Sequence, residues 1–159
     1  MISLTLVDDN VFFRQVLKTH LSVCSDVQMM FDSANGQDLL NELADCAPSA
    51  LPDIILLDLN MPVLDGRKTA KIIREKYPFI KIVMISLHFN KHVVSELLKC
   101  GVRGFIKKSI EAKELEVVIN TVAHDQIYMG QGLFKSVPTF TFKKFFQERR
   151  SNHRWLGIF

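Results

Sequence analysis

The chain has 159 residues, of which 48% are hydrophobic, so it has the length of one ordinary domain with a short appendage and is not a disordered protein. Its net charge of +3 is unevenly divided, because residues 134–159 carry +5 and the other residues carry −2. The mildly acidic larger part is therefore not expected to bind nucleic acid, and no apolar stretch approaches the roughly 18 residues that a membrane-spanning helix needs.

Short apolar runs typical of strands alternate with segments of helical periodicity over most of the chain. In chain order the predicted elements are strand Ser3–Val7, helix Val11–Cys24, strand Val27–Ser33, helix Gly36–Cys46, strand Ile54–Asp58, helix Gly66–Tyr77, strand Lys81–Ile85, helix Lys91–Cys100, strand Gly104–Lys107 and helix Glu111–Asp125. Asn10 can cap the first helix, and Asp65 with Gly66 turns the chain into the third. Five such units predict a parallel sheet covered by helices on both faces.

Three carboxylates stand where predicted strands end. Asp8 and Asp9 follow the first strand, and Asp58 closes the third. In an open α/β sheet, ligands bind outside the carboxyl ends of the strands, at a topological switch point. If these two strands run parallel and adjacent, the three acids share one crevice. That much negative charge needs a counter-ion, and a hard divalent cation with oxygen ligands, above all Mg²⁺, fits the need.

Two further polar residues fall at the same expected edge. Ser86 comes at the end of the fourth strand, and Lys108 follows the fifth. A carboxylate can act as a nucleophile toward phosphorus, while an ammonium and a hydroxyl can bind phosphoryl oxygens. Each residue alone has an ordinary role in a turn, a helix cap or a solvated charge pair. Their joint placement at strand ends indicates a phosphate acceptor.

The same stretches resemble the receiver domain of two-component response regulators, over roughly residues 2–125. The matching stretches are Leu6–Asn10 with Phe13 and Arg14, Pro52–Pro62 through Asp65 and Gly66, Ile82–Ser86, and Gly101–Lys108. The first and fifth strands most resemble the subfamily that usually carries a helix-turn-helix output domain for transcription regulation. The resemblance implies a flavodoxin-like α/β fold, a doubly wound five-stranded parallel sheet with five helices and strand order 2-1-3-4-5.

The resemblance also implies a role for each acid. Asp58 would accept a phosphoryl group from a phosphohistidine of a sensor histidine kinase. Asp9 and Asp58 would bind Mg²⁺ through their carboxylates, with Asp8 helping directly or through water and the backbone carbonyl of Asn60 completing the protein ligands. The protein would be a phosphoacceptor switch and not an enzyme, apart from catalysing its own phosphorylation and slow dephosphorylation.

For the remaining site residues the resemblance implies a switch. Lys108 would pair with the phosphoryl group. Ser86 would move toward the new phosphoryl oxygens, and Phe105 would swing inward into the vacated space. The surface of the fourth helix, fifth strand and fifth helix would then change its affinity for partners, and the resemblance allows a homodimer through this surface.

Three other functions compete with this one. A phosphatase that uses an aspartyl-phosphate generally needs a second acid two residues after the nucleophile, where this chain has Asn60. A flavodoxin-like flavin binder would need a Ser/Thr/Gly-rich phosphate loop after the first strand, but Asp8 and Asp9 repel phosphate unless a metal intervenes. A receiver-like interaction module that is not phosphorylated is disfavoured by the complete set of site residues, yet it stays open.

The sequence divides at residue 126 into a phosphoacceptor receiver domain, residues 1–126, and a linker with a basic, Phe-rich tail, residues 127–159, without a recognisable output domain. The tail is an altered end of a longer regulator, a peptide that docks on the domain or on a dimer partner, or a contact for nucleic acid or an anionic surface. Its many Phe residues predict that part of it packs against something. Cys24, Cys46 and Cys100 lack zinc spacing and are odd in number, which indicates reduced thiols and a cytoplasmic protein.

Overall fold

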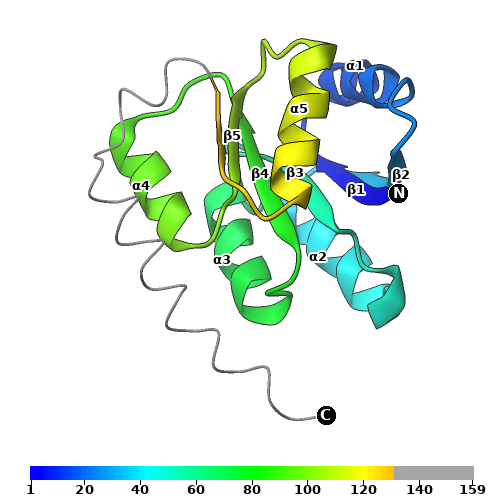
Figure 1. Ribbon diagram of the computed structural model, residues 1–159. Helices are drawn as coiled ribbons and strands as arrows, with labels where there is room; N and C mark the ends of the chain where they lie inside the picture. Colours follow the sequence, from blue (N-terminus) through cyan, green and yellow to red (C-terminus); the bar gives the residue numbers. More distant parts are fainter. Residues whose placement is uncertain (131–159) are drawn as a thin grey trace.

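The computed structural model describes residues 1–130, so the predictions for the tail from residue 131 onward lie outside the described residues. A parallel sheet is sandwiched between two layers of helices (Figure 1). The strands are β1 (Ile2–Val7), β2 (Val27–Ser33), β3 (Ile54–Asp58), β4 (Lys81–Ser86), β5 (Gly104–Lys107) and β6 (Tyr128–Met129). The helices are α1 (Val11–Leu21), α2 (Gly36–Asp45), α3 (Gly66–Lys76), α4 (Lys91–Lys99) and α5 (Ala112–Ala123), with a 3₁₀ turn at Pro48–Ala50.

The strand order is β2-β1-β3-β4-β5-β6, which confirms the predicted order of the first five strands. β6 is an addition, because it lies in the segment predicted as a connector and extends the sheet beyond residue 126. It pairs parallel to β5 through two backbone hydrogen bonds of 2.8 Å, from Tyr128 N to Arg103 O and from Gly130 N to Phe105 O. A further difference is the end of α1, which stops at Leu21 and not at the predicted Cys24.

Each face of the sheet has its own apolar core. On one face, side chains of α1 and α5 pack over Leu4 and Leu6 of β1 and Leu56 of β3. On the other, side chains of α2, α3 and α4 pack over Val7 and Leu57. All five residues of β3 are buried, as expected for a central strand covered on both sides. The sheet is therefore a rigid support for whatever its strand ends carry.

Capping residues fix where the helices begin. Asn10 accepts a hydrogen bond from Phe13 N at 3.0 Å, as predicted, and Asp65 accepts one from Lys68 N at 2.9 Å. Because Asn10 directly follows the Asp8–Asp9 pair, the start of α1 also fixes the turn that carries these carboxylates. None of the helices within residues 1–130 has the length and apolar character to cross a membrane.

Candidate functional site

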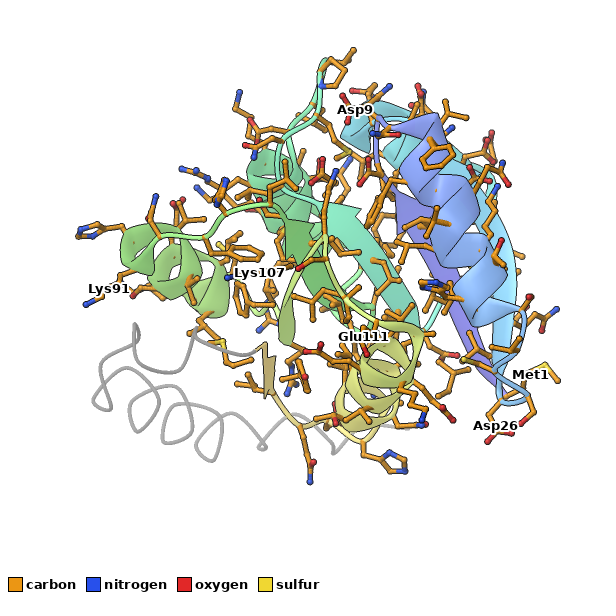
Figure 2. The ribbon with its side chains drawn as sticks, turned by 90° about the horizontal axis from the view of Figure 1, so that it is seen from above. Met1, Asp9, Asp26, Lys91, Lys107 and Glu111 are labelled. Carbon is orange, nitrogen blue, oxygen red and sulfur yellow. The ribbon has the colours of Figure 1, made fainter. Side chains whose placement is uncertain are left out.

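The three acids singled out in the sequence lie together at one edge of the sheet. β1 pairs with β3, so Asp8 after β1 and Asp58 at the end of β3 are neighbours. Asp8, Asp9 and Asp58 each offer a carboxylate oxygen within 4.8 Å of the others. Asp8 is 0% exposed and Asp58 3%, whereas Asp9 is exposed. Figure 2 shows Asp9 at one end of the molecule and Met1 with Asp26 at the other.

Lys108 supplies the positive charge of this cluster. Its Nζ lies 2.7 Å from Asp8 Oδ2 and 3.2 Å from Asp58 Oδ2. The backbone N–H of Lys108 donates to Ser86 O at 3.0 Å, which ties the residue to the end of β4. The ammonium also lies 5.0 Å from the centre of the Phe13 ring, in the range of a cation–π contact. Its neighbour Lys107, by contrast, is exposed.

The charges of the cluster shift the protonation of its members. Burial, with the nearby charge of Asp8 as the second cause, raises the pKa of Asp58 to about 6, even though Lys108 and the Leu59 N–H oppose this shift. Burial alone would lower the pKa of the Lys108 ammonium, but Asp8 and Asp58 together outweigh burial and raise it. Lys108 is therefore charged at neutral pH, and Asp58 is held close to its titration point.

The donor set fits a hard divalent cation. Asp8 Oδ1 accepts a hydrogen bond from Asn10 N at 2.9 Å, and Asp58 Oδ1 accepts one from Leu59 N at 2.9 Å. Apart from its ion pair with Lys108, the buried Asp8 Oδ2 accepts no hydrogen bond. One ammonium cannot balance three carboxylates, and carboxylate oxygens are the ligands that Mg²⁺ prefers. Asn60, predicted to add its carbonyl, is an exposed residue in the loop after β3.

Ser86 ends β4, which pairs with β3 on one side and with β5, the strand that carries Phe105, on the other. Ser86 is buried, and its Oγ donates to His88 O at 3.0 Å and accepts from His88 N at 3.3 Å. The Phe105 ring is fully buried and meets Phe89 edge-on, with 5.8 Å between ring centres. The inward swing predicted for Phe105 would therefore start from a ring that is already buried, and the switching role of both residues stays a prediction.

Gly66 closes the loop that follows Asp58. Its N–H donates to Leu59 O at 3.0 Å, so the loop folds back onto the end of β3. A Cβ on Gly66 would lie 2.0 Å from the carbonyl oxygen of Asp58. The close approach of this backbone requires the absence of a side chain, a reason for glycine that the predicted Asp65–Gly66 turn did not capture.

Arg14 is a contact of the site to which sequence reasoning gave no role. Its Nη1 donates to the backbone carbonyl of Asp8 at 2.6 Å. The feature of the sequence that could have indicated this contact is the position of Arg14, one turn into the helix that begins after the acid pair. A side chain so placed can reach back over the turn before it.

Comparison with known proteins points to a single family. A model of the response regulator receiver domain matches residues 4–120. The nitrate/nitrite response regulator protein NarL of Escherichia coli strain K12 is 31% identical over 131 residues, which make up 82% of this chain and 59% of that protein. The transcriptional regulatory protein DegU of Brevibacillus brevis is 28% identical over 128 residues, 80% of this chain and 52% of DegU. The chain thus spans between half and three-fifths of the length of these two relatives.

Solved structures with the same fold include the response regulator domain of Thermotoga maritima CheB. It matches with a TM-score of 0.69 and 27% identity, over 78% of this chain and 97% of that one. A LuxR-family two-component response regulator from Aurantimonas sp. SI85-9A1 matches with a TM-score of 0.73 over 94% of this chain and 99% of that one. Its identity is 19%, so this second likeness concerns the fold alone.

Proposed function

The chain belongs to the response regulator receiver domain family, and from this premise we propose that it accepts a phosphoryl group on Asp58 in a Mg²⁺-dependent reaction. The proposed donor is a phosphohistidine of a sensor histidine kinase. The observation that carries the proposal is the convergence of three carboxylates and one half-buried ammonium at a single sheet edge. A cluster of this composition serves phosphoryl transfer, which depends on positioning and charge neutralisation.

In the proposed transfer, a carboxylate oxygen of Asp58 forms a bond to phosphorus while the phosphorus–nitrogen bond of the phosphohistidine breaks. The histidine nitrogen keeps the electron pair of that bond. Asp8, Asp9, Asp58 and the Asn60 carbonyl would hold Mg²⁺, which supplies positive charge for the phosphoryl oxygens.

The other side chains around the cluster complete the proposed site. Lys108 balances charge from the opposite side and pairs with the phosphoryl group. Ser86 releases the backbone of His88 to donate its hydroxyl hydrogen to a phosphoryl oxygen. We further propose that the resulting change reaches partners through the surface of α4, β5 and α5, and that the whole protein serves transcription regulation, as the name of its relative DegU says of that protein.

The proposal is tested by incubating the protein with Mg²⁺ and acetyl phosphate and measuring its intact mass. We expect the mass of one added phosphoryl group in the wild type and no addition in Asp58→Asn. Asp26→Asn, an exposed acid at the other end of the sheet, serves as the matched control and is expected to be phosphorylated. An unmodified but folded wild type would favour an interaction module, and turnover of many equivalents of donor would favour a phosphatase.

The affinity for Mg²⁺ is expected to fall as the pH falls through 6. A ligating carboxylate must be deprotonated, and the pKa of Asp58 without the ion is raised to about 6. Protons therefore compete with the ion below pH 6, and the Kd for Mg²⁺ should be about tenfold higher at pH 5 than at pH 7. Isothermal titration calorimetry measures this, and a Kd that stays constant between pH 7 and pH 5 would contradict it.

The same raised pKa determines how the stability of the metal-free protein depends on pH. The pKa of Asp58 in the folded state lies above its unfolded value of 3.8, so the folded state holds the proton more tightly. The contribution of Asp58 to stability is present at low pH and is lost as the pH rises through about 6. Mg²⁺ should therefore raise the melting temperature more at pH 7.5 than at pH 5.

A further inference from the structure

An irregularity in β2 changes which side of the sheet its last residues face. Leu4 of β1 pairs with Met29, but Leu6 pairs with Asp32, so two residues of β2 oppose one residue of β1. Such a bulge reverses the alternation of the side chains that follow it. Met29 accordingly packs with the α1 and α5 core, whereas Phe31 packs with the α2, α3 and α4 core. Asp32 is thereby turned toward α1.

On α1, two basic side chains meet the Asp32 carboxylate. Arg14 Nε donates to Asp32 Oδ2 at 2.7 Å, and the Lys18 ammonium pairs with Asp32 Oδ1. Burial would raise the pKa of Asp32, but the hydrogen bonds from Lys18 and Arg14 hold it below its ordinary value, so the carboxylate is ionised at neutral pH. The Arg14 side chain is 13% exposed, so its contacts are largely shielded from water.

The same guanidinium reaches the candidate metal ligands. While its Nε is held by Asp32, its Nη1 donates to the carbonyl of Asp8 at 2.6 Å. That carbonyl belongs to the planar peptide unit that joins Asp8 to Asp9. Holding this unit therefore fixes the direction from which both side chains leave the backbone. A guanidinium can do this because its donors lie in one rigid plane, whereas the single ammonium of a lysine cannot reproduce both bonds.

We propose that Arg14 is a positioning residue for the metal site, held in place by Asp32 on the bulged end of β2. Arg14 contacts the backbone of the ligands and not the ion, and it preorganises Asp8 and Asp9 before the ion binds. This inference rests on the proposed function in requiring that these acids bind Mg²⁺. Lys18 pairs with the same Asp32 carboxylate from one helical turn further along α1, so it is a matched control with the same charge and the same partner.

The test compares Arg14→Gln, Arg14→Lys and Lys18→Gln with the wild type by calorimetric titration with Mg²⁺, after circular dichroism has confirmed that each variant is folded. We expect the Kd for Mg²⁺ to rise about tenfold in Arg14→Gln, since loss of a group that orients metal ligands typically weakens binding 10- to 100-fold. Arg14→Lys should show a smaller rise. Lys18→Gln should bind like the wild type, within about twofold.

A kinetic measurement separates positioning from general damage. With acetyl phosphate as donor, Arg14→Gln should need about tenfold more Mg²⁺ for half-maximal phosphorylation and recover the wild-type rate at saturating Mg²⁺. Equal Mg²⁺ affinity in both Arg14 variants and the wild type would overturn the inference, as would an equal loss in Lys18→Gln. If Arg14→Gln does not fold, the Mg²⁺ affinity of Arg14→Lys tests the inference in its place. A wild type that does not bind Mg²⁺ would overturn the proposed function as well.

Discussion

Replacing Lys108 by methionine is expected to slow phosphorylation by acetyl phosphate about 10²- to 10³-fold, the cost of removing one preorganised group that stabilises developing charge. The substitution also leaves the buried carboxylates of Asp8 and Asp58 without the ammonium that lies 2.7 Å and 3.2 Å from them. Removing one partner of a buried ion pair costs about 3–5 kcal/mol of unfolding free energy. Protonation of Asp58 relieves part of this cost, so we expect a loss of about 2–4 kcal/mol at pH 7.5 in the metal-free protein.

Two further measurements would identify the cause of the stability loss in Lys108→Met. The difference in stability from the wild type should shrink as the pH falls toward 5, because Asp58 then takes up a proton and its repulsion with Asp8 is lost. Mg²⁺ should restore more stability to Lys108→Met than to the wild type, since the cation replaces the missing positive charge.

Lys107→Met provides the control for Lys108→Met. Lys107 directly precedes Lys108 and is exposed. The unfolding free energy of Lys107→Met should therefore stay within about 0.5 kcal/mol of the wild-type value, and its phosphorylation rate should be unchanged. Urea unfolding measures the stability of both variants, and intact mass measures their phosphorylation. Equal losses in Lys107→Met and Lys108→Met would contradict the assignment of Lys108.

The second large effect is expected for Gly66→Ala. The added methyl group would lie 2.0 Å from the carbonyl oxygen of Asp58, a contact that cannot exist without displacement of the backbone. Asp58 belongs to β3, which is paired with β1 on one side and β4 on the other, so the strand has little room to retreat. Overpacking of this kind costs about 1–3 kcal/mol, and we expect a loss of about 3 kcal/mol with little or no phosphorylation of the folded variant.

Gly101→Ala separates lost stability from lost site geometry. Gly101 has φ +86°, a left-handed conformation that alanine adopts only with strain, and a Cβ there would meet the Arg74 side chain at 3.3 Å. The turn lies between α4 and β5, at the end of the sheet opposite Asp58. Gly101→Ala should lose about 1 kcal/mol and still be phosphorylated. Normal phosphorylation of Gly66→Ala would show instead that the loop after β3 yields without moving Asp58.

The fold could be predicted closely because its central strands carry a strong sequence signal. β3 is buried along its whole length, so residues 54–57 form a continuous apolar run that ends at Asp58. β6 could not be predicted, because two residues have no periodicity and the strand depends on the backbone groups that β5 leaves free at its edge. The apolar spacing of the first helix continues to Cys24, although the chain turns after Leu21 and Cys24 N donates to Leu21 O at 3.0 Å.

The convergence of the site residues could be predicted for the same topological reason, since parallel strands end at a common edge. Which side chains of the site pair with one another could not be predicted. Nothing in the spacing indicates that Lys108 lies closer to Asp8 than to Asp58. Strict alternation from Met29 would place Asp32 on the face away from α1, and only the bulge in β2 brings it to Arg14. Local backbone irregularities of this kind depend on the whole packed sheet, and a single sequence does not report them.

The pairing of β6 with β5 ties the end of the described chain to the strand that leads to Lys108. Gly130, the last described residue, is bonded through its N–H to the carbonyl of Phe105. A displacement of β5 would therefore shift β6 as well, so a movement of the strand that leads to Lys108 would reach the outer edge of the described sheet.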